Sequence, residues 1–196
     1  MQKYIAELLG TFGLTLAVLL SINGDFSVPT PVIAALTLGL FVYTIGHISG
    51  AHLNPAVTIG LLTVKKISCR DAAWYIVVQF IGAGFAMAFG RFFITNPVLA
   101  SMANETTVGV FEFVGMFFFA FGIAAVVFGK VSSSLSGLVV GMSLLLGISF
   151  ASFESSGILN PAVAFGIGSF SIGYIIGPVI GSIIAMCAFR CLSNEK

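Results

Sequence analysis

Charged side chains are scarce in this sequence: Lys, Arg, Asp and Glu make up 8% of its 196 residues and never form a long polar segment. A chain so poor in charge has no room for a soluble catalytic domain or for a nucleic-acid-binding domain. Hydrophobic residues make up 58%, Phe alone occurs 20 times, and the mean hydropathy is +1.12. This composition predicts an integral membrane protein, with residues 1–196 forming one domain inside a lipid bilayer.

Cysteine and histidine are also rare, and their positions argue against a metal or redox site. The three cysteines, Cys69, Cys187 and Cys191, are an odd number. They lack metal-ligand spacing with either His47 or His52. The residues present do not combine a nucleophile, a general base and oxyanion donors. We therefore expect no metal, no cofactor and no enzymatic activity.

Long apolar runs take the place of polar segments. Runs near residues 5–22, 31–48, 72–94, 108–128, 135–153 and 172–189 are each long enough to cross a bilayer as a helix. The first run resembles the apolar part of a secretory signal, but no small-residue cleavage site follows it, so we expect it to be retained as a span. The pattern predicts an all-α membrane protein with six transmembrane helices.

One pentapeptide, Leu-Asn-Pro-Ala-Val, occurs twice, at residues 53–57 and 159–163. Asn is a preferred N-cap and Pro is favoured at the first helical position, so each copy predicts the start of a helix. The apolar segments that follow, near 55–64 and 161–170, span about half a bilayer at ~1.5 Å per residue. We therefore predict two re-entrant half-helices that together supply a seventh crossing. Their motif residues are Asn54, Pro55, Ala56, Asn160, Pro161 and Ala162.

A second pair of motifs indicates that the two halves of the chain repeat. A Glu-x-x-Gly at Glu7 recurs at Glu112, an offset of 105 residues, and the pentapeptides are offset by 106. Each half has three spans, so the second half must insert upside down relative to the first. We predict an inverted repeat of about residues 1–97 and 105–196, whose half-helices meet near the midplane. The two Glu residues are expected to be structural and to accept hydrogen bonds from re-entrant-loop N–H groups, rather than to relay protons.

The basic residues predict the orientation, because cytoplasmic loops carry an excess of Lys and Arg. With the N-terminus inside, every basic residue except Arg91 falls on the cytoplasmic side. The cytoplasmic set is Lys3, Lys65, Lys66, Arg70, Lys130, Arg190 and Lys196, and Asp25, Asn96, Glu105 and Glu154 then face outward. We expect a multi-pass protein of the cell membrane, plasma or inner, with both termini in the cytoplasm.

Two half-helix starts that converge on one point predict a pore for uncharged solutes. Their positive dipole ends repel cations and hydronium, and the amides of Asn54 and Asn160 can donate hydrogen bonds to a passing hydroxyl. The non-helical backbone before each half-helix is tolerated at membrane depth only where it lines a cavity or is buried in protein. Its carbonyls, at Gly50, Ala51, His52, Leu53, Ser156, Gly157, Ile158 and Leu159, are candidates for a polar ladder. The His52 side chain is a candidate pore-lining or gating group, with ordinary packing as the alternative.

Two Asn-Pro-Ala boxes, paired Glu-x-x-Gly motifs and six spans resemble the aquaporin family of major intrinsic proteins over essentially the whole chain. The stretch Tyr-Thr-Ile-Gly-His-Ile-Ser-Gly-Ala-His at residues 43–52 is similar to the nodulin-like branch and its bacterial relatives. The resemblance implies a homotetramer with one pore per subunit and passive conduction of small uncharged solutes.

The resemblance also implies a second constriction, a selectivity filter on the extracellular side, at Ala34, Ile148, Gly157 and Val163. The family usually places an Arg three residues after the second motif Asn, where this chain has Val163. Two small residues and two branched aliphatics thus replace the aromatic, His and Arg side chains of its relatives. We expect a wide, apolar filter that passes glycerol, urea, uncharged metalloid hydroxides such as arsenite, and water.

Three alternatives stay open at this point. A strict water channel would share the fold but have a narrower filter. An ion-coupled secondary transporter also uses inverted repeats and broken helices, but the only acids expected inside the membrane are Glu7 and Glu112. A leaky ion channel is the third alternative, because the filter lacks its Arg.

Overall fold

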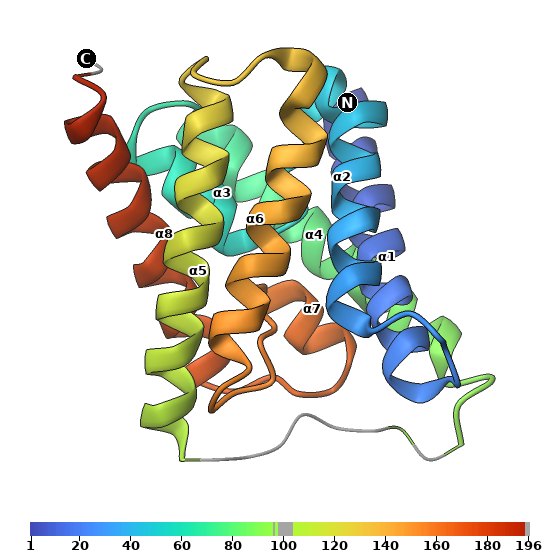
Figure 1. Cartoon of the computed structure of the whole chain (residues 1–196). Coiled ribbons are helices and arrows are strands. Elements are labelled where there is room, and N and C mark those ends of the chain that lie inside the picture. Colours follow the sequence, from blue (N-terminus) through green and yellow to red (C-terminus); the bar gives the residue numbers. More distant parts are fainter. Residues whose placement is uncertain (96, 98–103, 195–196) are drawn as a thin grey trace.

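The computed structural model describes residues 1–95, 97 and 104–194, and all regular secondary structure within these ranges is helical. Six helices are long and apolar enough to cross a membrane, the fifth of them including a short 3-10 turn (Ser133–Leu135). They are α1 (Gln2–Asn23), α2 (Thr30–Ser49), α4 (Cys69–Gly90), α5 (Glu105–Val127), α6 (Ser136–Ala151) and α8 (Gly173–Leu192). Two short helices, α3 (Pro55–Thr63) and α7 (Pro161–Gly166), lie among them (Figure 1). The prediction of an all-α protein with six spans plus short helices is confirmed, whereas Asn96 and Lys196 of the orientation argument lie outside the described residues.

Both short helices begin at the Pro of a pentapeptide, as the motif predicts. The Asn54 side chain accepts a hydrogen bond from the N–H of Ala56 at 2.8 Å and so caps α3. Asn160 caps α7 in the same way, accepting from Ala162 at 3.0 Å and from Val163 at 3.3 Å. These bonds satisfy N–H groups that the first turn of a helix leaves without a partner.

Several helix ends differ from the prediction by a few residues, such as the end of α4 at Gly90 rather than near residue 94, and two of the differences have a clear local reason. Helix α7 stops at Gly166 rather than near residue 170, because Gly168 adopts a left-handed φ of +78° and its N–H bonds to the carbonyl of Phe165. This is the usual glycine termination of a helix. Helix α4 begins at Cys69 rather than near residue 72, because the Ser68 hydroxyl caps it by accepting from the N–H of Asp71 at 3.1 Å.

The two short helices interlock the halves of the chain. Helix α3 follows α2 but packs mainly on α8, and α7 follows α6 but packs mainly on α4. In Figure 1, α3 lies in the upper part of the bundle and α7 in the lower part, while the N-terminus and the end of α8 lie at the same upper end. Each half therefore supplies a short helix that completes the packing of the other.

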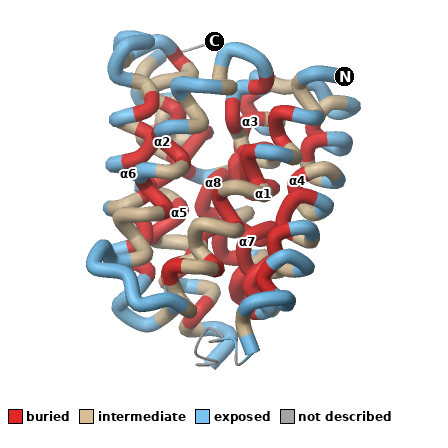
Figure 2. The backbone as a smooth tube through the Cα atoms, turned by 90° about the vertical axis from the view of Figure 1, so that its right-hand side faces the viewer, coloured by how far each residue is buried: buried red, intermediate tan, exposed pale blue. Residues whose placement is uncertain are grey.

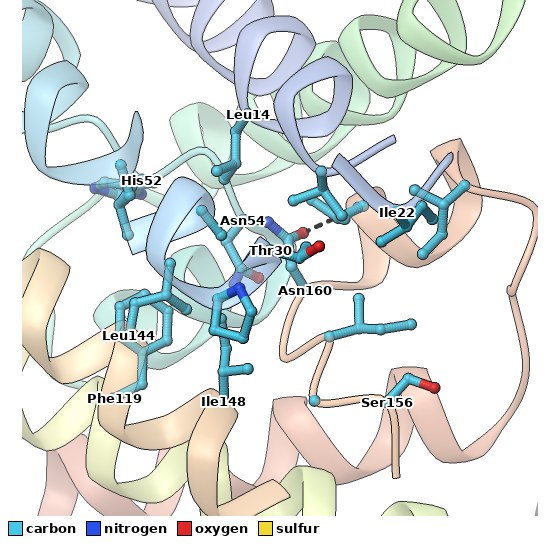
Figure 3. Close-up of a pocket in the computed structure, with 18 residues that line it drawn as sticks. Leu14, Ile22, Thr30, His52, Asn54, Phe119, Leu144, Ile148, Ser156 and Asn160 are labelled. Carbon is cyan, nitrogen blue, oxygen red and sulfur yellow. Dashed lines mark hydrogen bonds between the residues drawn. The ribbon is translucent and has the colours of Figure 1, made fainter. Parts of the chain in front are cut away.

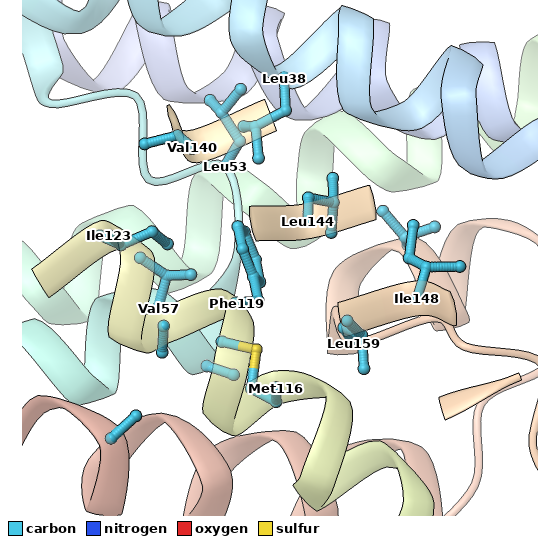
Figure 4. Packing of buried hydrophobic residues seen from close by; sticks show 14 of the residues in the cluster. Leu38, Leu53, Val57, Met116, Phe119, Ile123, Val140, Leu144, Ile148 and Leu159 are labelled. Carbon is cyan, nitrogen blue, oxygen red and sulfur yellow. The ribbon is translucent and has the colours of Figure 1, made fainter. Parts of the chain in front are cut away.

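The outer surface of the bundle is apolar, unlike the surface of a soluble protein, and buried polar groups lie within a largely hydrophobic interior. Leu36, Leu40 and Met142 are each at least 60% exposed. Figure 2 shows the exposed residues on the outside of the long helices and buried residues along α3 and α7. Such continuous apolar faces are stable in contact with lipid. The interior core, drawn in Figure 4, includes Leu53 and Leu159, the residues that open the two pentapeptides.

Glycines bring the long helices close enough for backbone contact. A Cβ at Gly82 of α4 would overlap the carbonyl oxygen of Leu8 in α1 and lie 3.0 Å from the nitrogen of Phe12. A Cβ at Gly84, two residues further along α4, would meet only the Phe165 ring at 3.7 Å, an ordinary contact. Small residues at helix crossings are the usual device for tight packing in membranes.

The crossing of α1 and α4 gives a direct stability test. Gly82→Val should lower the midpoint of thermal unfolding in detergent by roughly 5–10 °C, because overpacking a close contact costs about 1–3 kcal/mol. Gly84→Val adds the same side chain to the same helix and should shift the midpoint much less. Equal shifts for the two variants would show that helix propensity, and not the close crossing, sets the effect.

Candidate pore

A cavity of about 220 Å³ lies where the two short helices meet. Its wall includes Asn54 and Asn160, so we name it the asparagine cavity. Figure 3 shows these two side chains next to each other in the middle of the view, with His52 on one side and Ile22 and Ser156 on the other. The two pentapeptides, about 100 residues apart in sequence, are thus brought together at one internal surface.

A second cavity of about 240 Å³ adjoins the first. Its wall includes Val57 of α3, Val127 of α5 and Lys66, which follows α3, so we name it the lysine cavity. Leu38, His52 and Phe119 line both cavities. The two hollows therefore meet at these three residues.

The two asparagines bond each other's loop as well as their own helix. Asn54 Nδ2 donates to the carbonyl of Leu159 at 2.9 Å, and Asn160 Nδ2 donates to the carbonyl of Leu53 at 2.9 Å. An amide nitrogen carries two hydrogens, so each Asn keeps one N–H for a further acceptor. Both side chains line the asparagine cavity, where that acceptor can be a solute oxygen.

Glu7 of α1 holds the loop that leads into α3. Its carboxylate accepts from the N–H groups of His52 at 2.9 Å and Leu53 at 2.7 Å. It also accepts from Ser49 Oγ at 2.7 Å and from Gln79 Nε2 at 2.8 Å. The side chain is completely buried, so these four donors replace water as its hydrogen-bond partners.

Glu112 of α5 holds the second loop in nearly the same way. It accepts from the N–H groups of Ile158 at 2.9 Å and Leu159 at 2.6 Å, and from Ser155 Oγ at 2.8 Å. It is also fully buried. The hydrogen bonds expected from the sequence between these Glu residues and the re-entrant loops are therefore present in both halves.

The carboxylates stabilise an unusual backbone conformation. Leu53 and Leu159 have positive φ angles of 48° and 55°, a region that bulky residues rarely adopt. Each Leu N–H is bound to a Glu carboxylate and each Leu carbonyl to the Asn of the other half. Backbone strain of this kind persists only where surrounding bonds fix it, and here they fix the residue that immediately precedes each motif Asn.

The same bonds set the direction of the loop carbonyls. In a trans peptide the C=O points opposite to the N–H of the next residue. Because Glu7 binds the N–H groups of His52 and Leu53, the carbonyls of Ala51 and His52 point away from that buried carboxylate. Glu112 orients the carbonyls of Gly157 and Ile158 by the same geometry.

The remaining members of the expected ladder fall into two groups. Ala51 N–H binds Ser49 Oγ at 3.0 Å and Gly157 N–H binds Ser155 Oγ at 2.9 Å, which turns the carbonyls of Gly50 and Ser156 away from these hydroxyls. The carbonyls of Leu53 and Leu159 each already accept one hydrogen bond from an Asn amide. A carbonyl oxygen has two lone pairs, so each of these groups can still accept a second hydrogen bond.

All four predicted filter positions, Ala34, Ile148, Gly157 and Val163, line the asparagine cavity. They come from α2, α6, the loop before α7, and α7 itself. Within the described parts of the chain, none of the residues that line this cavity carries a charge at neutral pH if His52 is neutral. The four filter side chains are accordingly apolar or absent, and the polar groups of the cavity wall come from the side chains of Thr30, His52, Asn54, Ser156 and Asn160 and from the loop backbone.

His52 sits at the junction of the two cavities. Its Nδ1 lies 3.2 Å from Thr58 Oγ1, and its ring packs edge-on against Tyr75 with 5.1 Å between the ring centroids. The Thr58 hydroxyl donates to the carbonyl of Asn54 at 3.0 Å. The Thr58 hydroxyl therefore links the imidazole of His52 to the backbone of the first motif Asn.

Several residues of this network were not anticipated from the sequence. Tyr75 donates to the carbonyl of Ser49 at 2.8 Å, and Tyr174 accepts from the N–H of Ser156 at 3.3 Å. Gln79 bridges Glu7 and Thr58. A signal for part of this set was present: Ser49 and Ser155 lie 106 residues apart, the same offset as the pentapeptides.

Comparisons with known proteins agree with this architecture. A sequence profile described as major intrinsic protein matches residues 1–189. Aquaporin NIP1-1 of Zea mays is 31% identical over 210 residues, which cover 97% of this chain and 74% of the plant protein. Glycerol uptake facilitator protein-like 6 of Lactiplantibacillus plantarum is 32% identical over 220 residues, covering 100% of both chains.

A solved structure is also similar in fold. The X-ray structure of the aquaglyceroporin from Plasmodium falciparum superposes with a TM-score of 0.79 over 96% of this chain and 94% of that chain, at 22% identity. At that identity the likeness concerns the fold. The profile match over almost the entire length shows that this chain belongs to the major intrinsic protein family of membrane channels.

Proposed function

We propose that this channel conducts a broad set of small uncharged solutes: glycerol, urea, metalloid hydroxides such as arsenite, and water. The observation that carries the proposal is the wall of the asparagine cavity, where Ala34, Gly157, Ile148 and Val163 leave no aromatic or charged side chain at the four filter positions. An apolar wall offers little to replace the hydration of an ion, so charged species are disfavoured. The names of the plant and bacterial relatives, an aquaporin and a glycerol uptake facilitator-like protein, are consistent with the water and glycerol of this set.

In this proposal the solute path runs through both cavities and past the two asparagines. The free N–H of each Asn donates to a solute hydroxyl or water, and the loop carbonyls accept from it. The N-terminal ends of α3 and α7 add positive potential at the same level. Water molecules that orient their oxygens toward these donors cannot form the continuous hydrogen-bonded chain along which protons would move.

The hydrogen bonds of the two buried carboxylates favour a channel over an ion-coupled transporter. A coupling-ion site needs ionisable groups that can exchange their ligand. Glu7 and Glu112 each bind two backbone N–H groups and a serine hydroxyl, bonds that fix the loops. We assign both to structure.

The membrane orientation and assembly are also proposals. The N-terminus, the start of α4 and the end of α5 lie at one end of the bundle, and the end of α4 lies at the other (Figure 1). By their place in or next to these elements, Lys3, Lys65, Arg70 and Lys130 belong to the first end and Arg91 to the second. The rule that positive charge stays inside then places both termini in the cytoplasm, in a plasma or inner membrane. We propose a homotetramer in which each subunit has its own pore, on the family resemblance.

The filter is tested by Val163→Arg. We expect this change to lower glycerol, urea and arsenite permeability at least tenfold relative to water, because a long charged side chain fills much of a 220 Å³ cavity. Stopped-flow measurements on proteoliposomes give all four permeabilities from one preparation. Val163→Met adds length without charge and separates the two effects. Unchanged solute permeability in Val163→Arg would show that Val163 does not lie at the filter.

A further inference from the structure

Charge is nearly absent from the walls of the two cavities. Among the residues described, the asparagine cavity is lined by apolar, hydroxyl, amide and imidazole side chains and by backbone. The lysine cavity adds a single ammonium, that of Lys66. This is the one side chain along either wall that carries a full positive charge at neutral pH within the described ranges.

The backbone at the end of α3 fixes where Lys66 lies. Lys65 adopts a left-handed φ of +61°, and its N–H bonds to the carbonyl of Leu62 at 3.0 Å. Lys66 N–H reaches back to the carbonyl of Leu61 at 2.9 Å. This pair of bonds is the Schellman ending of a helix, and it holds the Lys66 backbone against the last turn of α3.

The side chain of Lys66 is also held. Its Nζ lies 4.4 Å from the centroid of the Phe128 ring, within the range of a cation–π contact. Phe128 stacks on Phe189 with 5.8 Å between ring centroids and an interplanar angle of 18°. The ammonium therefore sits over a packed aromatic surface, in a contact that attracts it without neutralising its charge.

We propose that Lys66 is a cation-repelling group of the channel, placed at the lysine cavity instead of at the filter around Val163. The inference rests on the proposed solute path through both cavities. Lys66 is exposed, so its ammonium lies toward the open end of the lysine cavity, where a positive charge raises the potential and disfavours cations while uncharged solutes feel no net force. The repulsion acts over about one Debye length, ~8–10 Å at physiological salt, so it is confined to the part of the path near Lys66.

The test is the ratio of cation to glycerol permeability in proteoliposomes of the full-length protein. Lys66→Met should raise the K⁺-to-glycerol ratio about three- to tenfold at low salt, and the increase should shrink as ionic strength rises. Lys66→Arg keeps the charge and should keep the wild-type ratio. Lys65→Met removes one charge from the adjacent residue, which does not line either cavity, and should change the ratio less than twofold.

Three outcomes would overturn the assignment of Lys66, and a fourth would instead refute the proposed function. An unchanged ratio in Lys66→Met, or an equal rise in Lys65→Met, would overturn the assignment of Lys66, the second because general surface charge would then explain the effect. A rise that does not depend on salt would also overturn it, because electrostatic repulsion is screened. Glycerol permeability of the wild-type protein is measured in the same vesicles, and its absence would instead refute the proposed function.

Discussion

Replacing Glu7 by alanine is expected to prevent formation of a stable channel. The change leaves four buried donors without their acceptor: two backbone N–H groups, the Ser49 hydroxyl and the Gln79 amide. A buried polar group that loses its partner costs about 1–3 kcal/mol, so the total is about 4–12 kcal/mol. Whole domains are stable by about 5–15 kcal/mol, which makes this loss comparable to the entire stability.

The number of donors left without an acceptor predicts the order of severity among variants. Glu112→Ala removes the acceptor of three donors and should be less severe than Glu7→Ala. Glu7→Gln retains one acceptor oxygen and should fall between Glu7→Ala and the wild-type protein. Glu154→Ala, at an exposed position, is the matched control and should change little. The readouts are the yield of monodisperse protein in detergent and its thermal midpoint; a fully stable Glu7→Ala protein would contradict the argument.

The fold follows largely from local signals in the sequence. Hydropathy alone locates the six spans, since each must satisfy its own backbone hydrogen bonds in lipid. The Asn-Pro pairs locate the starts of α3 and α7 because capping chemistry depends on adjacent residues. The end of α7 was harder to predict, because it depends on which residue adopts a left-handed conformation, and Gly168 lies inside an apolar run.

The site residues that could be predicted from the sequence are those that occur at matching positions in both halves. Glu7 and Glu112 are an example, because each half of the chain has one and each binds the loop before a short helix. Gln79 has no counterpart that bonds Glu112 within the described residues, so the repeat gave no sign of it. Its role depends on how α4 packs against α1, which a one-dimensional pattern does not contain. Lys66 was noted only as a cytoplasmic charge for a related reason: its place at a cavity depends on Phe128, 62 residues further along the chain.

The cross-bonds between the asparagines explain why the two motifs have to match. Each Asn carries out three tasks: it caps its own helix, it binds the loop of the other half, and it presents a donor to the cavity. The first task needs the side-chain oxygen and the other two need the nitrogen. A substitution that keeps the oxygen and removes the nitrogen therefore separates helix capping from pore chemistry.

Asn160→Asp makes this separation, and we expect it to lower the permeability of glycerol and water at least tenfold. Asp caps a helix as well as Asn does, so α7 should still form. The second oxygen of Asp cannot donate to the Leu53 carbonyl when ionised, and it brings negative charge to the asparagine cavity. A tenfold decrease in permeation rate corresponds to a barrier that is higher by about 1.4 kcal/mol. We attribute this increase to the loss of one hydrogen-bond donor in the path. Cation leak should rise at the same time, because the new charge attracts cations.

Asn104→Asp supplies the control for this experiment, because Asn104 caps α5 by accepting from the N–H of Thr106 at 2.9 Å and lies outside both cavities. The same chemical change there should leave glycerol and water permeability within about twofold, since capping is preserved. If Asn160→Asp kept both its glycerol permeability and its low cation leak, the donor role of the motif amides would be wrong. Asn160 would then serve only to cap α7, and the cross-bond to Leu53 would be dispensable.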